Sequence, residues 1–231
     1  MKKLLTILAV IAVFTNFSFA GGDALASAGD KALVFQFNGL ANLGAGSFMS
    51  SPNVSVGVLD IPQFNAIGVK YYFSDGFAGR AALLLGYNSE TEKAGAGGFS
   101  DRKESSMGLG LEFGIQSNII KSGSFVGFIG ATAGFAMVSG TLEPTTVSPP
   151  PTGVVTKYDA SATMFGLGGI AGFEYFIYDR ISLAAEYQFG LVLGGGTYEV
   201  TRQAQPTTTF DLPSMMSLGF NTVSFKLAAY F

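Results

Sequence analysis

Apolar residues alternate one by one with small or polar residues in several long segments of this 231-residue chain. The clearest segment is MGLGLEFGIQ, residues 107–116, in which every second residue from Met107 to Ile115 is large and apolar. Successive side chains of a β-strand point to opposite faces, so this pattern predicts a strand with one apolar and one polar face. The pattern recurs in residues 32–40, 66–73, 77–87, 165–175, 181–193 and 221–231.

An eighth strand is expected at residues 125–137, where the alternation is less clear. The segment FVGFIGATAGFAM is apolar or small throughout, and residues 122–142 carry no charge. A single transmembrane helix is therefore the alternative interpretation of this region. Its five glycines and the strand pattern on both sides favour a strand.

The first twenty residues have the layout of a secretory signal peptide. MKKLLTILAVIAVFTNFSFA has a positive head, an apolar run from Leu4 to Phe14 and a small residue at Ala20. The apolar run is too short for a membrane-spanning helix. We therefore expect export and cleavage after Ala20, with residues 21–231 forming a single mature domain.

The composition excludes some classes of exported protein and favours a strand-rich one. The chain has no Cys, which excludes a disulfide scaffold, whereas 32 Gly, 22 Phe and 9 Tyr suit strands and turns. Without Lys2 and Lys3, 11 basic residues stand against 16 acidic ones, a net charge of −5. This acidic balance offers no patch for nucleic acid.

The connections between the expected strands are alternately short and long. The short turns are expected at residues 74–76, 117–123 and 178–180, and the long loops at about 41–65, 89–104, 139–159 and 196–214. This alternation around an even number of strands is typical of outer-membrane β-barrels, with short periplasmic turns and long extracellular loops. A sheet in lipid must also close, because an open edge would leave backbone groups unpaired. The expected fold is all-β: an eight-stranded antiparallel transmembrane β-barrel with an up-and-down meander.

The last strand supports the same location. Its apolar face consists of Val223, Phe225, Leu227, Ala229 and Phe231. The ending VSFKLAAYF resembles the C-terminal signal of bacterial outer-membrane proteins, a final Phe preceded by apolar residues at alternate positions. GVKYYFSDGFAGRAALLLGY and FEYFIYDRISLAAEYQFG are similar to the outer membrane protein β-barrel domain family, the small eight-stranded OmpA/OmpX-type barrels. The resemblance implies a place in the cell outer membrane and recognition of the last strand by the barrel-assembly machinery, and we expect a monomer.

If the apolar faces point to lipid, six charged residues point into the barrel. A Lys or Arg on the lipid face would cost about 2–4 kcal/mol near the midplane. The interior set, three cations and three carboxylates, is Lys70, Arg80, Glu112, Glu174, Glu186 and Lys226. An eight-stranded barrel is just wide enough for side chains to fill it, which favours a salt-bridged plug. A charged lining for a narrow pore is the alternative, because the inward glycines leave space around the charges.

Catalytic and cofactor functions find little support. GLGGIA, residues 166–171, matches a dinucleotide-binding pattern but lies within an expected strand, not between a strand and a helix. Glu174 and Glu186 could be drawn as an acid–base pair, yet both belong inside the barrel. The known enzymes of small outer-membrane barrels rely on a catalytic histidine, and this chain has none. With His and Cys both missing, no metal or cofactor is expected, although loop carboxylates such as Glu90, Glu92 and Asp101 leave calcium open.

The expected function is therefore that of a non-enzymatic outer-membrane protein. Outer-membrane lipid is its expected surrounding, and its long loops are the expected place for a surface ligand, because binding residues concentrate on loops of rigid scaffolds. A narrow, porin-like channel for small solutes is the second hypothesis.

Overall fold

The computed structural model describes residues 27–38, 55–56, 59–60, 64–92, 101–145, 156–202 and 206–231. The expected signal peptide lies outside these residues. The described residues form strands, turns and short irregular segments without a helix. Consequently, no helix in these ranges is long and apolar enough to cross a membrane.

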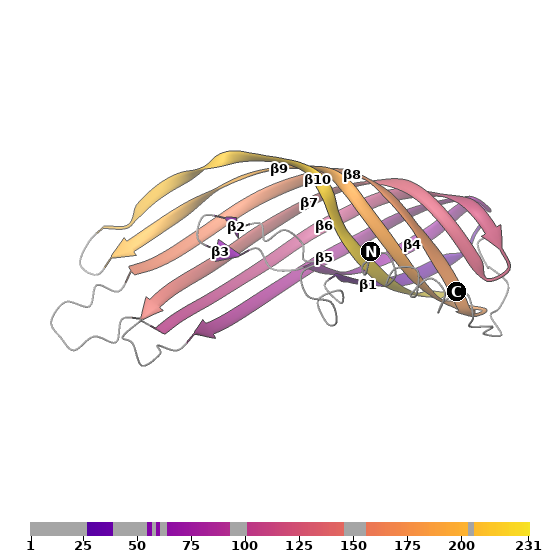
Figure 1. Ribbon diagram of the computed structural model, residues 1–231, viewed down its shortest axis with the longest axis horizontal. Coiled ribbons are helices and arrows are strands. Elements are labelled where there is room, and N and C mark those ends of the chain that lie inside the picture. The colour runs from indigo at the N-terminus through magenta and orange to yellow at the C-terminus, as the bar shows by residue number, and fades with distance from the viewer. Residues whose placement is uncertain are drawn as a thin grey trace, which may run out of the picture.

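Eight antiparallel strands close in a ring (Figure 1). Each strand pairs with its neighbour along the chain, and β1 pairs with both β4 and β10. The all-β, up-and-down antiparallel architecture is thus confirmed, and residues 125–137 form a strand and not a helix. The ring strands are β1 (Lys31–Asn38), β4 (Phe64–Ser74), β5 (Phe77–Glu92), β6 (Asp101–Ser122), β7 (Phe125–Thr145), β8 (Thr156–Tyr178), β9 (Ile181–Arg202) and β10 (Thr208–Tyr230).

The strands are longer than the sequence pattern predicted, and the connections are correspondingly shorter. The strands β6 to β10 have 21 to 23 residues each. Half or more of each expected loop, at 89–104, 139–159 and 196–214, is strand, so those boundaries were wrong. The expected turn at 117–123 was also too wide, because β6 continues to Ser122 and Gly123 adopts a positive φ of 52°.

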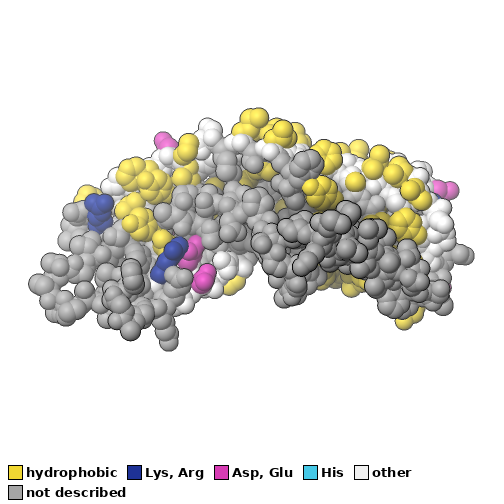
Figure 2. Space-filling view, in the orientation of Figure 1, with side chains coloured by type: hydrophobic (Ala, Val, Ile, Leu, Met, Phe, Trp, Pro, Cys, Tyr) yellow, Lys and Arg dark blue, Asp and Glu magenta, His cyan; other side chains and the backbone are white. Residues whose placement is uncertain are grey.

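The ring has an apolar outer face and a more polar inner face, as the alternation requires. Large apolar side chains such as Leu83, Phe113 and Leu183 are exposed on the outside, at 40–58% of their surface. In the space-filling view, apolar side chains cover much of the convex surface, and the charged side chains visible there lie toward the two ends (Figure 2). This arrangement reverses that of a water-soluble protein, in which the apolar residues are inside.

The wall of the ring is uneven in height. Strand β1 pairs with β10 only from Ala32↔Tyr230 to Asn38↔Ser224, whereas β10 continues to pair with β9 as far as Thr208↔Val200. Six strands therefore run beyond the ring as an open sheet, which extends to the left in Figure 1. We call this part the extension. It comprises residues 87–92 of β5, 101–107 of β6, 139–145 of β7, 156–161 of β8, 197–202 of β9 and 208–211 of β10.

On β7 to β9 the polarity of the two faces is exchanged in the extension. The inner face carries apolar and aromatic residues there, among them Leu142, Ala160 and Tyr198, which belong to one hydrophobic cluster, whereas β6 places the ion pair of Arg102 and Glu104 on the inner face. Above Tyr87 and Met107 the outer face is polar, with Thr141 and Asp159 as neighbours across β7 and β8. A small hairpin, β2 (Ser55–Val56) with β3 (Leu59–Asp60), lies close to β6, β7 and β8.

Candidate functional site

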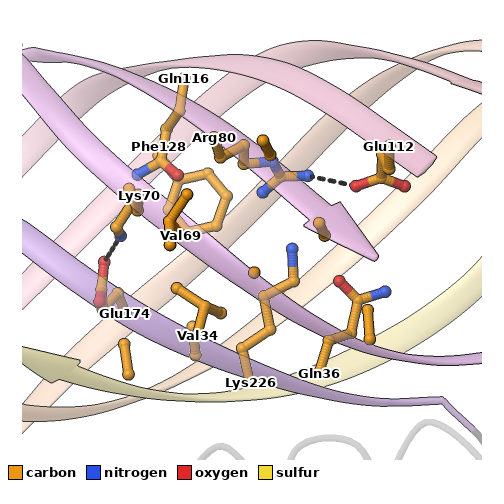
Figure 3. A pocket seen from close by; sticks show the side chains of 16 residues that line it. Val34, Gln36, Val69, Lys70, Arg80, Glu112, Gln116, Phe128, Glu174 and Lys226 are labelled. Carbon is orange, nitrogen blue, oxygen red and sulfur yellow. Dashed lines mark hydrogen bonds and ion pairs between the residues drawn. The ribbon is translucent and has the colours of Figure 1, made fainter. Parts of the chain in front are cut away.

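Six charged side chains meet inside the ring, and we call them the interior charge network. They come one each from the inner faces of β4, β5, β6, β8, β9 and β10, so each strand contributes through the alternation of its own residues. Figure 3 shows five of these side chains around the same space, each from a different strand: Lys70, Arg80, Glu112, Glu174 and Lys226. The members are the six residues expected from the sequence: Lys70, Arg80, Glu112, Glu174, Glu186 and Lys226.

One part of the network is centred on Glu174, whose side chain is 1% exposed. Lys70 Nζ donates a hydrogen bond of 2.7 Å to Glu174 Oε2. Tyr230 Oη donates one of 2.7 Å to Glu174 Oε1, and the Ser182 hydroxyl donates to the same oxygen. The Lys70 ammonium also lies 5.3 Å and 5.5 Å from the ring centroids of Tyr72 and Tyr230. Both oxygens of this buried carboxylate are therefore satisfied, as its burial requires.

The other part is centred on Glu186, which is fully buried. Arg80 binds it in a bidentate manner: Nη2 donates to Oε1 over 2.8 Å, and Nη1 donates to Oε2. Lys226 Nζ donates to Oε2 over 2.8 Å. The single negative charge of Glu186 is thus shared between two cations, Arg80 and Lys226. A planar guanidinium matches a carboxylate in this way, which adds geometric specificity to the Arg80–Glu186 pair.

Glu112 and Gln188 complete this second part. Glu112 Oε1 lies 3.5 Å from Arg80 Nη2, so it provides a second negative charge for the group with two cations. Gln188 Nε2 lies 3.2 Å from Glu186 Oε1 and 3.4 Å from Glu112 Oε2, and it donates to both carboxylates. The complete network has three positive and three negative charges and is neutral at pH 7.

An apolar layer closes the interior at the end where the short turns lie. Tyr72, Val126 and Phe176 are each 0% exposed. The ring of Tyr230 packs against Phe176 at 5.2 Å and against Tyr72 at 6.5 Å between centroids. Together with Ala32, Ala78 and Ala228 these side chains form one buried hydrophobic cluster across the ring. A continuous water path past this layer would require several of them to move.

Inward glycines make room for large neighbouring side chains. A Cβ on Gly114 would lie 2.9 Å from Arg80 Nε, and one on Gly172 would lie 2.7 Å from Phe128 Cζ. A Cβ on Gly108 would lie 2.4 Å from the ring of Phe64. The expectation that glycines leave open space around the charges was therefore wrong at these three positions, because rings and a guanidinium fill it.

A small cavity remains beside the network. It has a volume of about 40 Å³ and touches Gln36, Lys70, Arg80, Glu112 and Lys226, among others (Figure 3). A cavity of about 10–15 Å³ is the minimum that holds one water molecule, so this cavity is large enough for water. Its lining is charged enough to hold water there.

The chemistry available to the network is electrostatic. Glu174 and Glu186 each accept hydrogen bonds from a cation and are closed off from solvent, so neither presents a free carboxylate to a polymer. Within the described ranges, no three acidic side chains are grouped so that they could hold a metal ion. The side chains of Glu92 and Asp101, two of the three carboxylates considered for calcium, lie outside the described residues.

The apolar set of the last strand lies on the outer face. Phe225, Leu227 and Phe231 are exposed, at 37–68% of their surface. Leu227 is the register partner of Phe35, and Ala229 that of Leu33. The amide of Phe231 donates a hydrogen bond of 2.9 Å to the carbonyl of Lys31. Val223, the fifth member of the set, follows an irregularity in the pairing of β10 with β9.

Sequence reasoning missed several partners of the network. Ser182, Gln188 and Tyr230 were not singled out, although all three bond to its carboxylates. Their position was the available signal, because each lies an even number of residues from a charged residue of its own strand and therefore shares its face. Ser182 and Gln188 share the inner face of β9 with Glu186, and Tyr230 shares that of β10 with Lys226.

Comparisons with protein-family models, with curated proteins and with solved structures find no match for this chain.

Proposed function

We propose that this chain is a non-enzymatic β-barrel protein of the outer membrane of a Gram-negative-type bacterium. In this proposal the ring spans the membrane as a monomer, the short turns face the periplasm and the extension stands outside the cell. The barrel interior is a plug, and the role of the protein is envelope-structural or surface-binding. Residues 1–20 serve as a cleaved export signal, the barrel-assembly machinery reads the last strand, and the chain belongs with the OmpA/OmpX-type barrels.

One observation carries the proposal: an apolar band surrounds a ring whose interior is charged. On β8 the outer-face residues of this band run from Phe165 to Tyr175. At about 3.3 Å per residue this is about 33 Å of strand. With a tilt of about 40° the band is about 25 Å tall, which is the height of the apolar band of outer-membrane barrels. Above it, Ser139 and Ser161 begin the polar outer face of the extension.

The plug is supported by the neutral network and the apolar layer. Removing one partner of a buried ion pair typically destabilises the folded protein by about 3–5 kcal/mol, so loss of any one member of this network would be unfavourable. The extension then offers its surface and the connections beyond it for binding, because loops on a rigid scaffold carry recognition.

A narrow channel remains the second candidate, and the cavity of about 40 Å³ beside Lys70, Arg80 and Glu112 is the observation that favours it. A channel needs that cavity to connect to water on both sides. The apolar layer of Tyr72, Phe176 and Tyr230 separates it from the turn end.

The mature protein, refolded into phosphatidylcholine vesicles, tests the proposal. We expect it to float with the vesicles and to resist protease over the ring strands, and failure of both would refute membrane insertion. In planar bilayers we expect no openings from folded protein. The double variant Tyr72→Ala/Tyr230→Ala should produce openings, because it removes two rings of the apolar layer. Reproducible openings of the unmodified protein that change in Glu112→Gln would replace the plug with a channel.

A further inference from the structure

A groove crosses the outer face of the extension just above the apolar band, and we call it the outer groove. Its volume is about 350 Å³, within the range of about 300–1,000 Å³ for ligand pockets. Two rows of outer-face residues form its walls. The first row is Tyr87, Met107, Ser139, Ser161 and Thr197, and the second includes Ser105, Thr141, Asp159 and Glu199.

The sheet register places these groups side by side. Thr141 is the partner of Asp159 across β7 and β8, and Asp159 is the partner of Glu199 across β8 and β9. Side chains that face each other in this way have their Cβ atoms about 4.5–5.5 Å apart. The outer groove therefore presents a regular grid of hydroxyl and carboxylate groups on rigid strands.

Only part of this grid is engaged within the protein. Thr141 Oγ1 donates a hydrogen bond of 2.8 Å to Asp159 Oδ1, and Lys157 Nζ lies 3.0 Å from the same oxygen. The hydroxyls of Ser161 and Thr197 lie 3.3 Å apart. Glu199, Ser105 and Ser139 have no side-chain hydrogen bond among the described residues, which leaves a carboxylate and two hydroxyls for a ligand.

The kinds of group in the outer groove select one ligand chemistry. A phosphate or another anion would need cations, but the described residues that line the outer groove include no Lys or Arg, and Asp159 and Glu199 among them are acidic. A metal ion would need more clustered acids than these strands supply in the described ranges. Hydroxyls can donate or accept and a carboxylate can accept several bonds, which suits a ligand with many hydroxyl groups. Tyr87 is 74% exposed at one end of the first row and offers a ring face for the apolar side of such a ligand.

We propose that the outer groove binds a saccharide, which Glu199 and the serine and threonine hydroxyls hold by hydrogen bonds and which Tyr87 covers at one end. The inference rests on the proposed function for the source of the sugar. In that orientation the outer groove lies at the surface of the lipid, where the head group of a glycolipid and a soluble oligosaccharide can both reach it. The shared chemistry is the polyhydroxylated ring.

Native mass spectrometry of the full mature protein in detergent micelles tests this inference. The two probes are bacterial lipopolysaccharide and its lipid-free core oligosaccharide, each titrated against the unmodified protein. The variants are Glu199→Gln and Tyr87→Ala. Glu143→Gln is the matched control, because it makes the same chemical change on the outer face of a different strand, β7, at a residue that does not line the outer groove. Loss of a hydrogen bond to a charged group should weaken binding about tenfold or more in Glu199→Gln, and Glu143→Gln should bind like the unmodified protein.

Each result has a defined meaning. Binding of both probes with similar affinity identifies a soluble saccharide as a sufficient ligand, and binding of lipopolysaccharide alone identifies a membrane glycolipid. Binding of neither probe by folded protein, or an equal loss in Glu143→Gln, overturns the inference. Circular dichroism of each variant checks folding. Flotation with phosphatidylcholine vesicles is measured separately, so a failure of membrane insertion refutes the proposed function without deciding whether the free oligosaccharide binds.

Discussion

Replacing Glu186 with Gln removes the one carboxylate that accepts hydrogen bonds from two cations of the interior charge network. Arg80 donates to it twice and Lys226 once, and its side chain has no solvent exposure. In Glu186→Gln both cations stay buried, and the nearest remaining carboxylate is Glu112, at 3.5 Å from Arg80. An uncompensated buried charge of this kind costs about 3–5 kcal/mol. At about 1.36 kcal/mol for each factor of ten, the equilibrium constant for unfolding rises about 10²- to 10⁴-fold.

Urea unfolding of protein refolded in lipid vesicles, followed by far-UV circular dichroism, measures this change. The chain has no Trp, so tryptophan fluorescence is not a readout. Glu112→Gln is the control, because Glu112 makes one longer ion pair and is 14% exposed, and its loss should cost about 1–2 kcal/mol. Adding Lys226→Met to Glu186→Gln should recover part of the loss, with a coupling free energy of at least about 1 kcal/mol. A loss in Glu186→Gln no larger than in Glu112→Gln would refute the assignment of Glu186 as the centre of the network.

The same unfolding assay checks three further predictions. Lys70→Met leaves Glu174 with only the hydroxyls of Ser182 and Tyr230, so we expect a loss of about 3 kcal/mol, and a neutral result would show that the hydroxyls suffice. Gly114→Ala places a Cβ 2.9 Å from Arg80 Nε and should lower the free energy of unfolding by about 1–3 kcal/mol. In the control Gly195→Ala the new Cβ meets nothing within 4 Å, so the free energy of unfolding should stay within about 0.5 kcal/mol of the unmodified protein. Equal effects of the two substitutions would contradict the packing described. Phe176→Ala opens a cavity in the apolar layer and should cost about 3–5 kcal/mol, while Tyr87→Ala, at an exposed position, should cost less than about 1 kcal/mol. The reverse order would argue against a packed layer.

The inward placement of the charges could be predicted from the sequence because strand geometry alone decides it. A residue such as Glu112 in MGLGLEFGIQ lies opposite its apolar neighbours whatever the rest of the fold is. The choice of partners could not be predicted in this way. Lys70 on β4 reaches Glu174 on β8 across the interior, and that distance depends on the stagger of every strand between them.

The lengths of the strands could not be predicted from the apolar alternation, because it marks only the part of each strand whose outer face is apolar. In β8 the alternation of faces continues without interruption from Tyr175 to Lys157. On the N-terminal side of Phe165, however, the outward residues become Thr163, Ser161 and Asp159. A pattern defined by outward apolar residues ends there, although the backbone continues as a strand. At the opposite end, a register irregularity between Asn118 and Ile120 of β6 interrupts the alternation and hides the last residues of that strand.

The exchange of polarity between ring and extension has a consequence for how deep the protein sits. The outer residues of neighbouring strands change from apolar to polar close to one register row, which consists of Met107, Ser139, Ser161 and Thr197. In the proposed orientation, sinking by one row would bring serine and threonine hydroxyls into hydrocarbon, and rising by one row would expose Phe165 and its row neighbour Leu111 to water. Either displacement costs free energy, because the first places polar groups without partners in hydrocarbon and the second places apolar surface in water. In the proposed orientation, the sequence of each long strand thus encodes a vertical position as well as a fold, and a bilayer of different thickness would have to adapt to the protein.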